Sequence, residues 1–433
     1  MKTKLNLAVA AALLAAASSA NAGIMIPAGD WTLDIGGIVN TYYTHTKASG
    51  DQHGAGYGGV FFGGTNEPLG GATDDAQSNI TTGLLPNYLS VSGKTRQNDL
   101  DVGFTISINP GSSTRSAGLQ SLQGGGSAAF QENRQAFLTF GDKSWGSIKI
   151  GKDLGIFASD AILNDMTLLG VGSGAGGLAG NTTTLGRIGT GFIYADWKSQ
   201  IAYSSPNFSG FSFTAGVTQA WNAIAVGAGN DSSPLVAGND GLGFNSASSD
   251  KRGGSSPAFE GKASYEFAGD LGGKVWVSAL TQKVEGFGGN IGDDRANAYD
   301  IGATLNLAGF GLTGYYYTGE GIGQTVQLNH GFDPTGKARD SDGYYVQATY
   351  TLPGVGTKLG VSYGASTLEG NSADVVLDEL EDSMWTVGAY HPITKHLNLV
   401  AEYSNSESDF QRKGFSDLQG KSKTIALGAI LFF

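Results

Sequence analysis

The most informative stretch of the sequence is Thr424-Ile-Ala-Leu-Gly-Ala-Ile-Leu-Phe-Phe433. If the stretch is extended, alternate side chains share one face. That face is entirely apolar: Ile425, Leu427, Ala429, Leu431 and Phe433. It suits either the core of a soluble sheet or the lipid side of a membrane barrel. Since an open sheet edge cannot stand in hydrocarbon, a membrane strand at this place must pair and close the sheet.

The N-terminus has the pattern of a secretory signal peptide. Lys2 and Lys4 precede an apolar stretch over 5–17, and Ala20-Asn21-Ala22 offers small residues for cleavage. The apolar stretch is too short to span a bilayer as a helix. We therefore expect a signal peptide over 1–22, cleaved near Ala22, and one mature domain over 23–433.

The composition excludes several classes of protein. Cysteine is absent, which excludes a small disulfide-stapled fold, and the net charge of −12 argues against a nucleic-acid partner. The mature chain has no apolar run long enough for a membrane helix. Its 70 glycines and many aromatic residues suit a β-barrel whose polar interior hides the apolar exterior from average hydropathy.

The dominant pattern is alternation of apolar and polar residues between breaks rich in Gly, Asn, Asp and Ser. In 299–307, Tyr299, Ile301 and Leu305 share a face, with Asp300 and Thr304 on the other. The same alternation occurs over 344–352, 211–218 and 397–404. The apolar face is the core in a soluble sandwich, whereas in a membrane barrel it faces lipid and small polar or charged residues line water.

Connection lengths favour the barrel. Short turns occur at 141–146, 269–273, 309–311 and 353–356. They alternate with long polar segments at 47–79, 111–131, 152–187, 220–256, 285–296, 320–340, 367–382 and 405–421. Short turns on one side and long loops on the other are typical of outer-membrane barrels. The sequence thus predicts an all-β fold, a sixteen-stranded antiparallel transmembrane β-barrel with both termini on the short-turn side.

The predicted strands lie between these breaks. Their ranges are 31–46, 80–95, 99–109, 132–140, 147–151, 189–203, 210–219, 257–268, 274–284, 297–308, 311–319, 341–352, 357–366, 383–392, 397–405 and 422–433. Aromatic residues near strand ends predict girdles at the two membrane interfaces. These residues are Trp31, Tyr42, Tyr43, Tyr194, Trp197, Tyr315, Tyr316, Tyr317 and Tyr403.

Several segments resemble the general diffusion porins of Gram-negative bacteria. Asn133-Arg-Gln-Ala-Phe-Leu-Thr-Phe-Gly-Asp-Lys-Ser-Trp-Gly-Ser-Ile-Lys-Ile-Gly-Lys152 resembles their fourth and fifth strands. The segments 185–189 with 201–211, and 390–403, resemble the region after the porin constriction loop and the turn before the last strands. Phe433 matches the assembly signal of the family. The segments occur in the family's order across the mature chain.

The resemblance implies a water-filled barrel in the outer membrane, trimeric in the family, whose third loop, here 152–187, folds inward and narrows the pore. It places Asp165 on the acidic constriction position and Arg134 and Arg187 on basic wall positions. Asp153 and Asp160 lie on the same loop. Lys149 alternates with two isoleucines and should face the lumen. Facing acidic and basic rows create a transverse field that orients polar solutes.

The chain departs from the family pattern at three positions. Leu169 stands at the second acidic position of the loop, Tyr88 where a pore-lining Arg is common, and Gly37 in place of a Lys. The constriction is therefore less charged than is usual in the family. Either the pore is wider and less selective, or Tyr88 and Leu169 shape it for a particular solute.

Four functions compete at this point. The first is passive diffusion of small hydrophilic solutes and ions through a homotrimer in contact with membrane lipid and lipopolysaccharide. The others are a substrate-selective channel, an outer-membrane enzyme and an adhesin. An enzyme would need a nucleophile beside a base, and the nearest candidates, His391 and His396, lie on the short-turn side. The five histidines are expected to be solvated or turn residues and lack metal-ligand spacing, so no metal site or cofactor is predicted.

Overall fold

The computed structural model describes residues 23–50, 76–112, 131–173, 183–221, 256–284, 294–328, 330–333, 337–374 and 377–433. The predicted signal peptide and its cleavage site lie outside the described residues, as does most of the long segments at 47–79, 111–131 and 220–256. Within the described ranges, no helix has the length and apolar character needed to cross a membrane.

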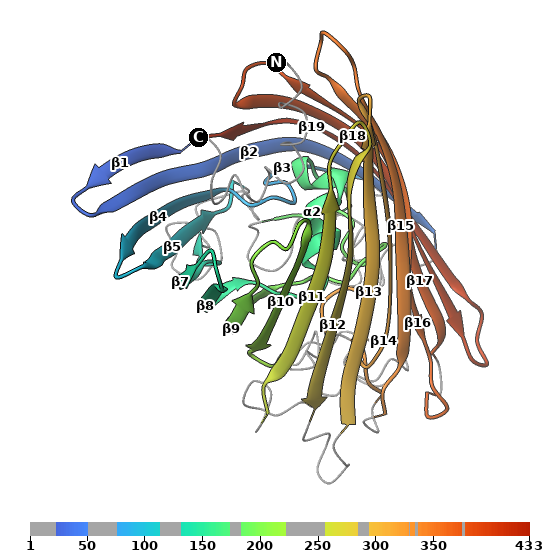
Figure 1. Cartoon of the computed structure of the whole chain (residues 1–433). Helices are drawn as coiled ribbons and strands as arrows, with labels where there is room; N and C mark the ends of the chain where they lie inside the picture. The colour runs from blue at the N-terminus through green and yellow to red at the C-terminus, as the bar shows by residue number, and fades with distance from the viewer. Residues whose placement is uncertain are drawn as a thin grey trace, which may run out of the picture.

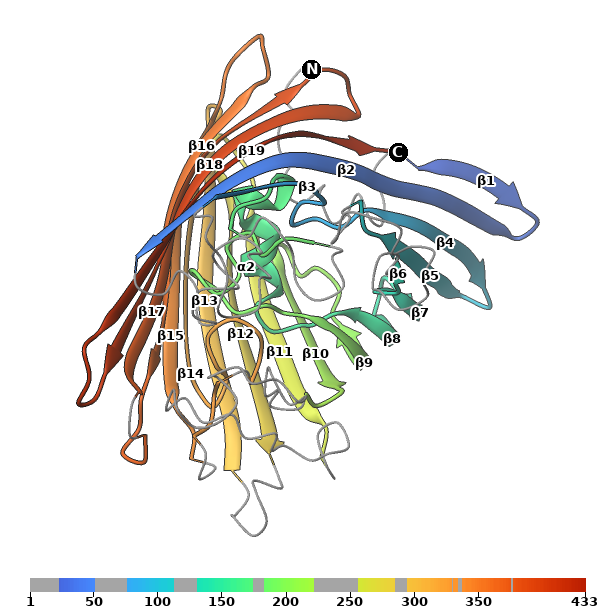
Figure 2. The same ribbon diagram turned by 180° about the vertical axis from the view of Figure 1, so that it is seen from behind.

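Sixteen strands pair antiparallel in chain order and close into a barrel, which confirms the predicted fold (Figures 1 and 2). They are β2 (Trp31–Gly50), β4 (Tyr88–Gln97), β5 (Leu100–Pro110), β7 (Ala136–Asp142), β8 (Gly146–Leu154), β9 (Trp197–Ser204), β10 (Phe211–Thr218), β11 (Ala258–Phe267), β12 (Gly272–Val284), β13 (Asp294–Leu307), β14 (Phe310–Glu320), β15 (Asp340–Thr351), β16 (Lys358–Glu369), β17 (Leu377–Pro392), β18 (Leu397–Arg412) and β19 (Leu418–Phe432). Three short strands join this wall: β1 (Ile24–Ala28), β3 (Ala76–Thr81) and β6 (Gln131–Glu132).

The barrel closes where β19 pairs with β2, from Gly420 opposite Gly50 to Phe432 opposite Ile38. Beyond the strand, Phe433 and Gly37 exchange two backbone hydrogen bonds of 3.0 and 2.7 Å. On β19, Ile425 and Leu427 are about half exposed, whereas Ala426 and Ile430 are buried inside. The terminal apolar face therefore points outward. The strand β1, which was not predicted, pairs with the part of β2 that precedes Gly37 and so continues the pairing past the C-terminus.

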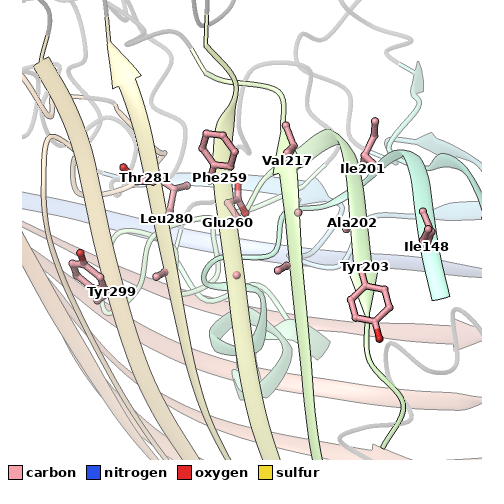
Figure 3. Close-up of a pocket in the computed structure, with 14 residues that line it drawn as sticks. Ile148, Ile201, Ala202, Tyr203, Val217, Phe259, Glu260, Leu280, Thr281 and Tyr299 are labelled. Atoms are coloured by element: carbon pink, nitrogen blue, oxygen red, sulfur yellow. The ribbon is translucent and has the colours of Figure 1, made fainter. Parts of the chain in front are cut away.

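The outer face of the wall is apolar and shallowly grooved between β8 and β13 (Figure 3). Register places Tyr203, Ala215, Gly261, Ala279 and Tyr299 in one row across β9–β13. The three small central residues leave a groove of about 600 Å³, bordered by the larger Phe259, Val217 and Ile201. Such a surface suits contact with hydrocarbon rather than water.

Several predicted strand boundaries were wrong. The predicted strand 80–95 is interrupted at 82–87, since Pro86 has no N–H for a ladder bond. The strand predicted to begin at 189 begins at Trp197, because the preceding residues lie inside the barrel. The predicted long loops 367–382 and 405–421 are mostly strand: β17, β18 and β19 run further, and polar residues on both faces hide this extension from the alternation.

The aromatic girdle prediction also fails at several positions. Tyr42, Tyr315 and Tyr317 are buried inside the barrel, whereas Tyr43 and Tyr316 point outward. Consecutive residues of a strand alternate between faces, so a run of three tyrosines cannot lie at one interface. Tyr194 is likewise buried and precedes β9. A position near a strand end therefore does not show that an aromatic residue faces the membrane. Which face it takes depends on its place in the alternation along the strand.

The closure predicts a position-specific cost for substituting Gly37. A Cβ atom there would lie 2.4 Å from the carbonyl oxygen of Tyr88 and 2.6 Å from the Phe433 ring, whereas one at Gly314 would have no atom within 4 Å. We expect Gly37→Ala to destabilise the barrel by about 1–3 kcal/mol through overpacking at the closure. Urea unfolding in lipid vesicles measures this. Equal stability of Gly37→Ala and Gly314→Ala would contradict it.

Candidate pore constriction

The segment between β8 and β9, residues 155–196, is called loop 3 here, and its described parts, 155–173 and 183–196, enter the barrel. It contains the helix α2 (Ser159–Asn164) and the 3₁₀ turn η2 (Met166–Leu169); residues 174–182 lie outside the described ranges. α2 lies within the ring of strands in both views (Figures 1 and 2). The inward fold of this loop agrees with the expectation from the family resemblance, although its bounds extend past 187.

Loop 3 packs on an apolar part of the inner wall. Phe157, Ala161 and Ile188 contact a buried cluster with Trp276 and Tyr345 of the wall. Met166, Leu169 and Val171 contact a second cluster on the other side, with wall residues Ile38, Tyr390, Val400 and Ile430. The inward wall residues in these two clusters therefore meet the loop rather than water. Where the loop covers the wall, apolar inward residues are buried and stabilise it.

A wall carboxylate holds the start of loop 3. Glu260 of β11 accepts hydrogen bonds from the backbone N–H groups of Ile156 and Phe157, both at 2.8 Å. Its other oxygen accepts from Lys198 at 2.6 Å and Thr218 at 2.8 Å. The Lys198 and Glu260 side chains are fully buried. A buried carboxylate with this many donors is satisfied, so it fixes the loop rather than meeting solute.

Asp160 anchors α2 to the strands β11 and β12 of the wall. Its carboxylate pairs with Lys274 of β12 at 2.6 Å and with Lys262 of β11 at 3.0 Å. The carboxylate itself is almost fully buried, while the two lysines are about one-quarter exposed. Two cations on one buried acid give α2 a fixed position on the wall.

Asp165 and Arg187 lie together on the wall side of the loop. The Asp165 carboxylate accepts from the backbone N–H of Thr167 at 3.0 Å, from the Thr167 hydroxyl, and from the backbone of Arg187. The Arg187 guanidinium donates to the Met384 carbonyl at 2.9 Å and to the Ser362 hydroxyl. Both residues are buried. The structure thus brings this predicted acid and base together, but it does not place them across an opening from each other.

A second wall carboxylate holds the loop after η2. Glu402 of β18 accepts from the backbone N–H groups of Val171 at 2.7 Å and Gly172 at 2.9 Å, and from the Tyr390 hydroxyl at 2.6 Å. The Tyr42 hydroxyl donates to the Leu169 carbonyl at 2.6 Å. The backbone of this irregular segment is therefore satisfied by side chains of the barrel wall.

Arg134 and Tyr88 border a cavity of about 60 Å³ on the other side of loop 3. The barrel side of the cavity comes from residues 84–86, from the strands β4, β5, β8 and β9, and from the residues preceding β7. Loop 3 forms the other side through Ile162, Leu163, Leu168, Thr183, Ile188 and Tyr194. The Arg134 guanidinium lies 5.8 Å from the centre of the Trp197 ring, within cation–π range. Two of the predicted constriction residues thus meet at one cavity.

Lys149 and Asp153 lie close to this cavity on β8. They form an ion pair four residues apart, and Asp153 also accepts from Gln135, which lines the cavity, at 3.0 Å. Lys149 stands over the Phe137 ring at 4.9 Å. The pair is joined within one strand, so it contributes a local dipole rather than a charge facing the loop.

Sequence reasoning did not identify the residues that hold loop 3. Glu260, Glu402, Tyr390 and Lys198 occupy inward positions of otherwise alternating strands. The alternation over 397–404 puts Glu402 and Val400 on the same, inward face, but it does not connect either residue to the loop. A large apolar residue on a nominally water-facing side, such as Val400, is the signal that another segment covers that part of the wall.

No candidate metal cluster includes a histidine of the described part of the chain. Among those residues, no group of three or more His, Asp or Glu side chains could hold a metal ion. His330 is a turn residue whose Nε2 atom is buried. Burial, together with the nearby Arg339, lowers the pKa of His330 to about 3, so it is uncharged at neutral pH.

A closed sixteen-stranded barrel with an inward loop anchored to its wall defines a channel protein. The sequence profile of the Gram-negative porins matches residues 8–411, and the chain belongs to that family. No curated protein matches the chain. The barrel is accordingly an outer-membrane channel for passive diffusion of solutes.

Solved structures share this fold at low sequence identity. The outer membrane channel DcaP of Acinetobacter baumannii superimposes with a TM-score of 0.62 at 15% identity, covering 95% of this chain and 100% of that one. An anion-selective porin from Comamonas acidovorans gives 0.57 at 15% identity, covering 93% and 100%. The trimer form of OmpT from Vibrio cholerae gives 0.51 at 13% identity, covering 93% and 99%.

The anchoring of loop 3 by Glu402 can be tested with Glu402→Ala. Each lost hydrogen bond to the carboxylate is worth about 1.5–3 kcal/mol, so the 170–172 segment should open more easily. We expect amide hydrogen exchange at Val171 and Gly172 to accelerate at least about tenfold, and the open channel to become noisier. Glu407→Ala is the matched control, because Glu407 on the same strand pairs with the partly exposed Lys421. Unchanged exchange at both amides would show that Glu402 does not hold the loop.

Proposed function

We propose that solutes cross this porin on the side of loop 3 that faces β4, β5, β8 and β9. The supporting observation is the position of the described part of loop 3, which packs tightly on the wall from β11 round to β19 and β2 but leaves a cavity beside Arg134 and Tyr88. The cross-section there is set by side chains of the loop and the wall. Small hydrophilic solutes and ions are the expected cargo.

In this proposal the predicted constriction residues have two roles. Arg134 and Tyr88 border the passage, with the Lys149–Asp153 pair beside them. Asp160, Asp165 and Arg187 hold the loop in place and so set the width of the opening. The transverse field is correspondingly weaker than that of facing charged rows, because most loop charges are already paired.

We also propose a homotrimer in contact with outer-membrane lipid and lipopolysaccharide, formed after signal-peptide cleavage near Ala22, with Phe433 as the assembly signal. Family membership and the apolar outer face support this. An enzymatic role has little support. His391, one of the two nearest candidates, receives or donates a 2.8 Å hydrogen bond with Thr357 at the short-turn end of the barrel, away from loop 3.

The channel can be observed directly in planar lipid bilayers. We expect stepwise, ohmic conductance in molar salt, on the order of a nanosiemens for a water-filled pore of this strand number. Steps in groups of three would support the trimer, and cross-linking in detergent gives an independent count of subunits. Well-folded protein without any conductance would refute the diffusion function.

The passage beside Arg134 makes a prediction about ion selectivity. One charge about 4 Å from a permeating ion is worth about 1 kcal/mol even in water, so Arg134→Gln should shift the anion-to-cation permeability ratio about fivefold toward cations. Tyr88→Ala should instead raise conductance with little change in selectivity. Reversal potentials in a salt gradient measure both. Arg96→Gln is the control, since Arg96 is exposed and paired with Asp101 and Asp142 near the short turns. If Arg134→Gln behaves like this control, the passage lies elsewhere.

A further inference from the structure

The inner wall beside the end of loop 3 contains a buried carboxyl group, that of Asp382 on β17. Only 2% of the residue is exposed, and its Oδ1 atom has no hydrogen-bond partner among the described residues. The hydroxyl of Ser408, its cross-strand neighbour on β18, is buried and lacks a partner in the same described set. An ionised carboxylate at this position would lack the donors or the cation that a buried charge needs.

The charged groups around Asp382 do not compensate a negative charge. Those that act on it are Glu381 on the same strand and Asp409 on β18, and both are acidic. The cation of the adjoining loop segment, Arg187, donates instead to a hydroxyl of β16 and a carbonyl of β17. Another titratable neighbour, the phenol of Tyr317 on β14, is neutral below about pH 10.

Asp382 lies outside the membrane-spanning part of the wall. The outward side chains of Glu381 and Asp409 are cross-strand neighbours there, and the apolar outer face begins at Trp385, nearer the short-turn side. Burial raises the pKa of Asp382 to about 8, opposed by the Ser408 hydroxyl and supported by the two acids. The carboxyl group is therefore mostly protonated at pH 7, and its O–H faces a hydroxyl acceptor on Ser408.

The same part of the wall holds the end of loop 3. Ser366 of β16, the other cross-strand neighbour of Asp382, accepts a hydrogen bond from the backbone N–H of Gly191 at 2.9 Å. The Ser366 carbonyl accepts from the neutral Gln324 side chain at 2.6 Å, and Gln324 also donates to a carbonyl of β17 at 3.1 Å. The segments that carry Gly191 and Gln324 are thus docked on the wall beside Asp382. Hydrating an ionised carboxylate there requires its cover to open.

We propose that Asp382 is a proton-dependent latch for the end of loop 3 on the long-loop side of the pore. With the proton bound, the neutral carboxyl group stays buried, and Gly191 and Gln324 remain docked on Ser366. When the proton is lost, the carboxylate draws in water and the segment with Gly191 separates from the wall. The latch is independent of the route that solutes take past loop 3.

Opening of the latch is favoured by rising pH. In the opened segment Asp382 has the ordinary pKa of an aspartate, near 4, whereas in the closed segment its pKa is about 8. Opening therefore releases a proton between about pH 4 and pH 8, so the closed form loses its advantage as the pH rises through this window. The opening equilibrium should increase by up to about tenfold per pH unit within the window and become constant above it.

Amide hydrogen exchange at Gly191 tests the latch in the full-length protein in lipid vesicles. The exchange rate of the wild type is divided by that of Asp382→Asn at the same pH, which removes the intrinsic pH dependence of exchange. Asparagine has the shape of the protonated acid but cannot ionise, so this ratio should rise on the order of a hundredfold between pH 5 and pH 8. Glu407→Gln is the matched control, since Glu407 on β18 is partly exposed and paired with Lys421. The ratio of wild type to this control should not change with pH.

Infrared spectroscopy reads the protonation state directly and does not depend on the folding of Asp382→Asn. The wild type at pH 6 should show the C=O stretch of a protonated carboxylic acid, part of which disappears as the pH passes about 8. Ser408→Ala removes the hydroxyl that favours the ionised form, so this titration should move to higher pH.

An exchange ratio that stays constant from pH 5 to pH 8 would overturn the latch. The same holds if Gly191 exchanges relatively faster at low pH, or if no carboxyl band titrates near pH 8. Folded protein without conductance would instead refute the channel and leave the latch intact, because neither exchange nor infrared spectra depend on conduction.

Discussion

The barrel depends on the requirement that every backbone N–H and C=O in hydrocarbon has a partner within the protein. The chain meets this requirement by pairing β19 with β2 and by extending the pairing past the strand, where Phe433 bonds to Gly37. Gly37 is needed because the Tyr88 carbonyl and the Phe433 ring come too close for any Cβ. The remaining edge of β2 is covered by β1. The pairing of β19 with β2 therefore fixes the barrel architecture independently of the residues that line the pore.

The same requirement explains the interior. Loop 3 is irregular backbone at the depth of the membrane, and it is tolerated because the wall satisfies it. Glu260 and Glu402 together accept four of its N–H groups, and the Tyr42 and Tyr345 hydroxyls donate to its carbonyls. These inward polar residues bind the backbone of loop 3 rather than solute. Asp160, Asp165 and Arg187 of the loop are similarly paired, which agrees with the proposed passage on the side of Arg134 and Tyr88.

Much of the fold could be predicted from the sequence because alternation and connection length are local properties. They gave the strand number, the closure and the outward face of β19. They failed where the local signal is absent: Pro86 interrupts one predicted strand, and β18 extends past the alternation into water with polar residues on both faces. The site was harder to predict. Arg134 and Tyr88 were identified by resemblance, but the Glu402 contact joins residues more than two hundred positions apart, which no spacing encodes.

The net charge of the whole chain and the charge at the cavity suggest opposite ion preferences. A net charge of −12 suggests a preference for cations, but charges separated by more than about 8–10 Å of salt water are screened. Arg134 lies beside the cavity and is nearly buried, so its field acts at short range and with little screening. An acidic chain can therefore carry a basic side chain at the proposed passage. The selectivity of such a channel follows from the few side chains at its narrowest point rather than from the charge of the whole chain.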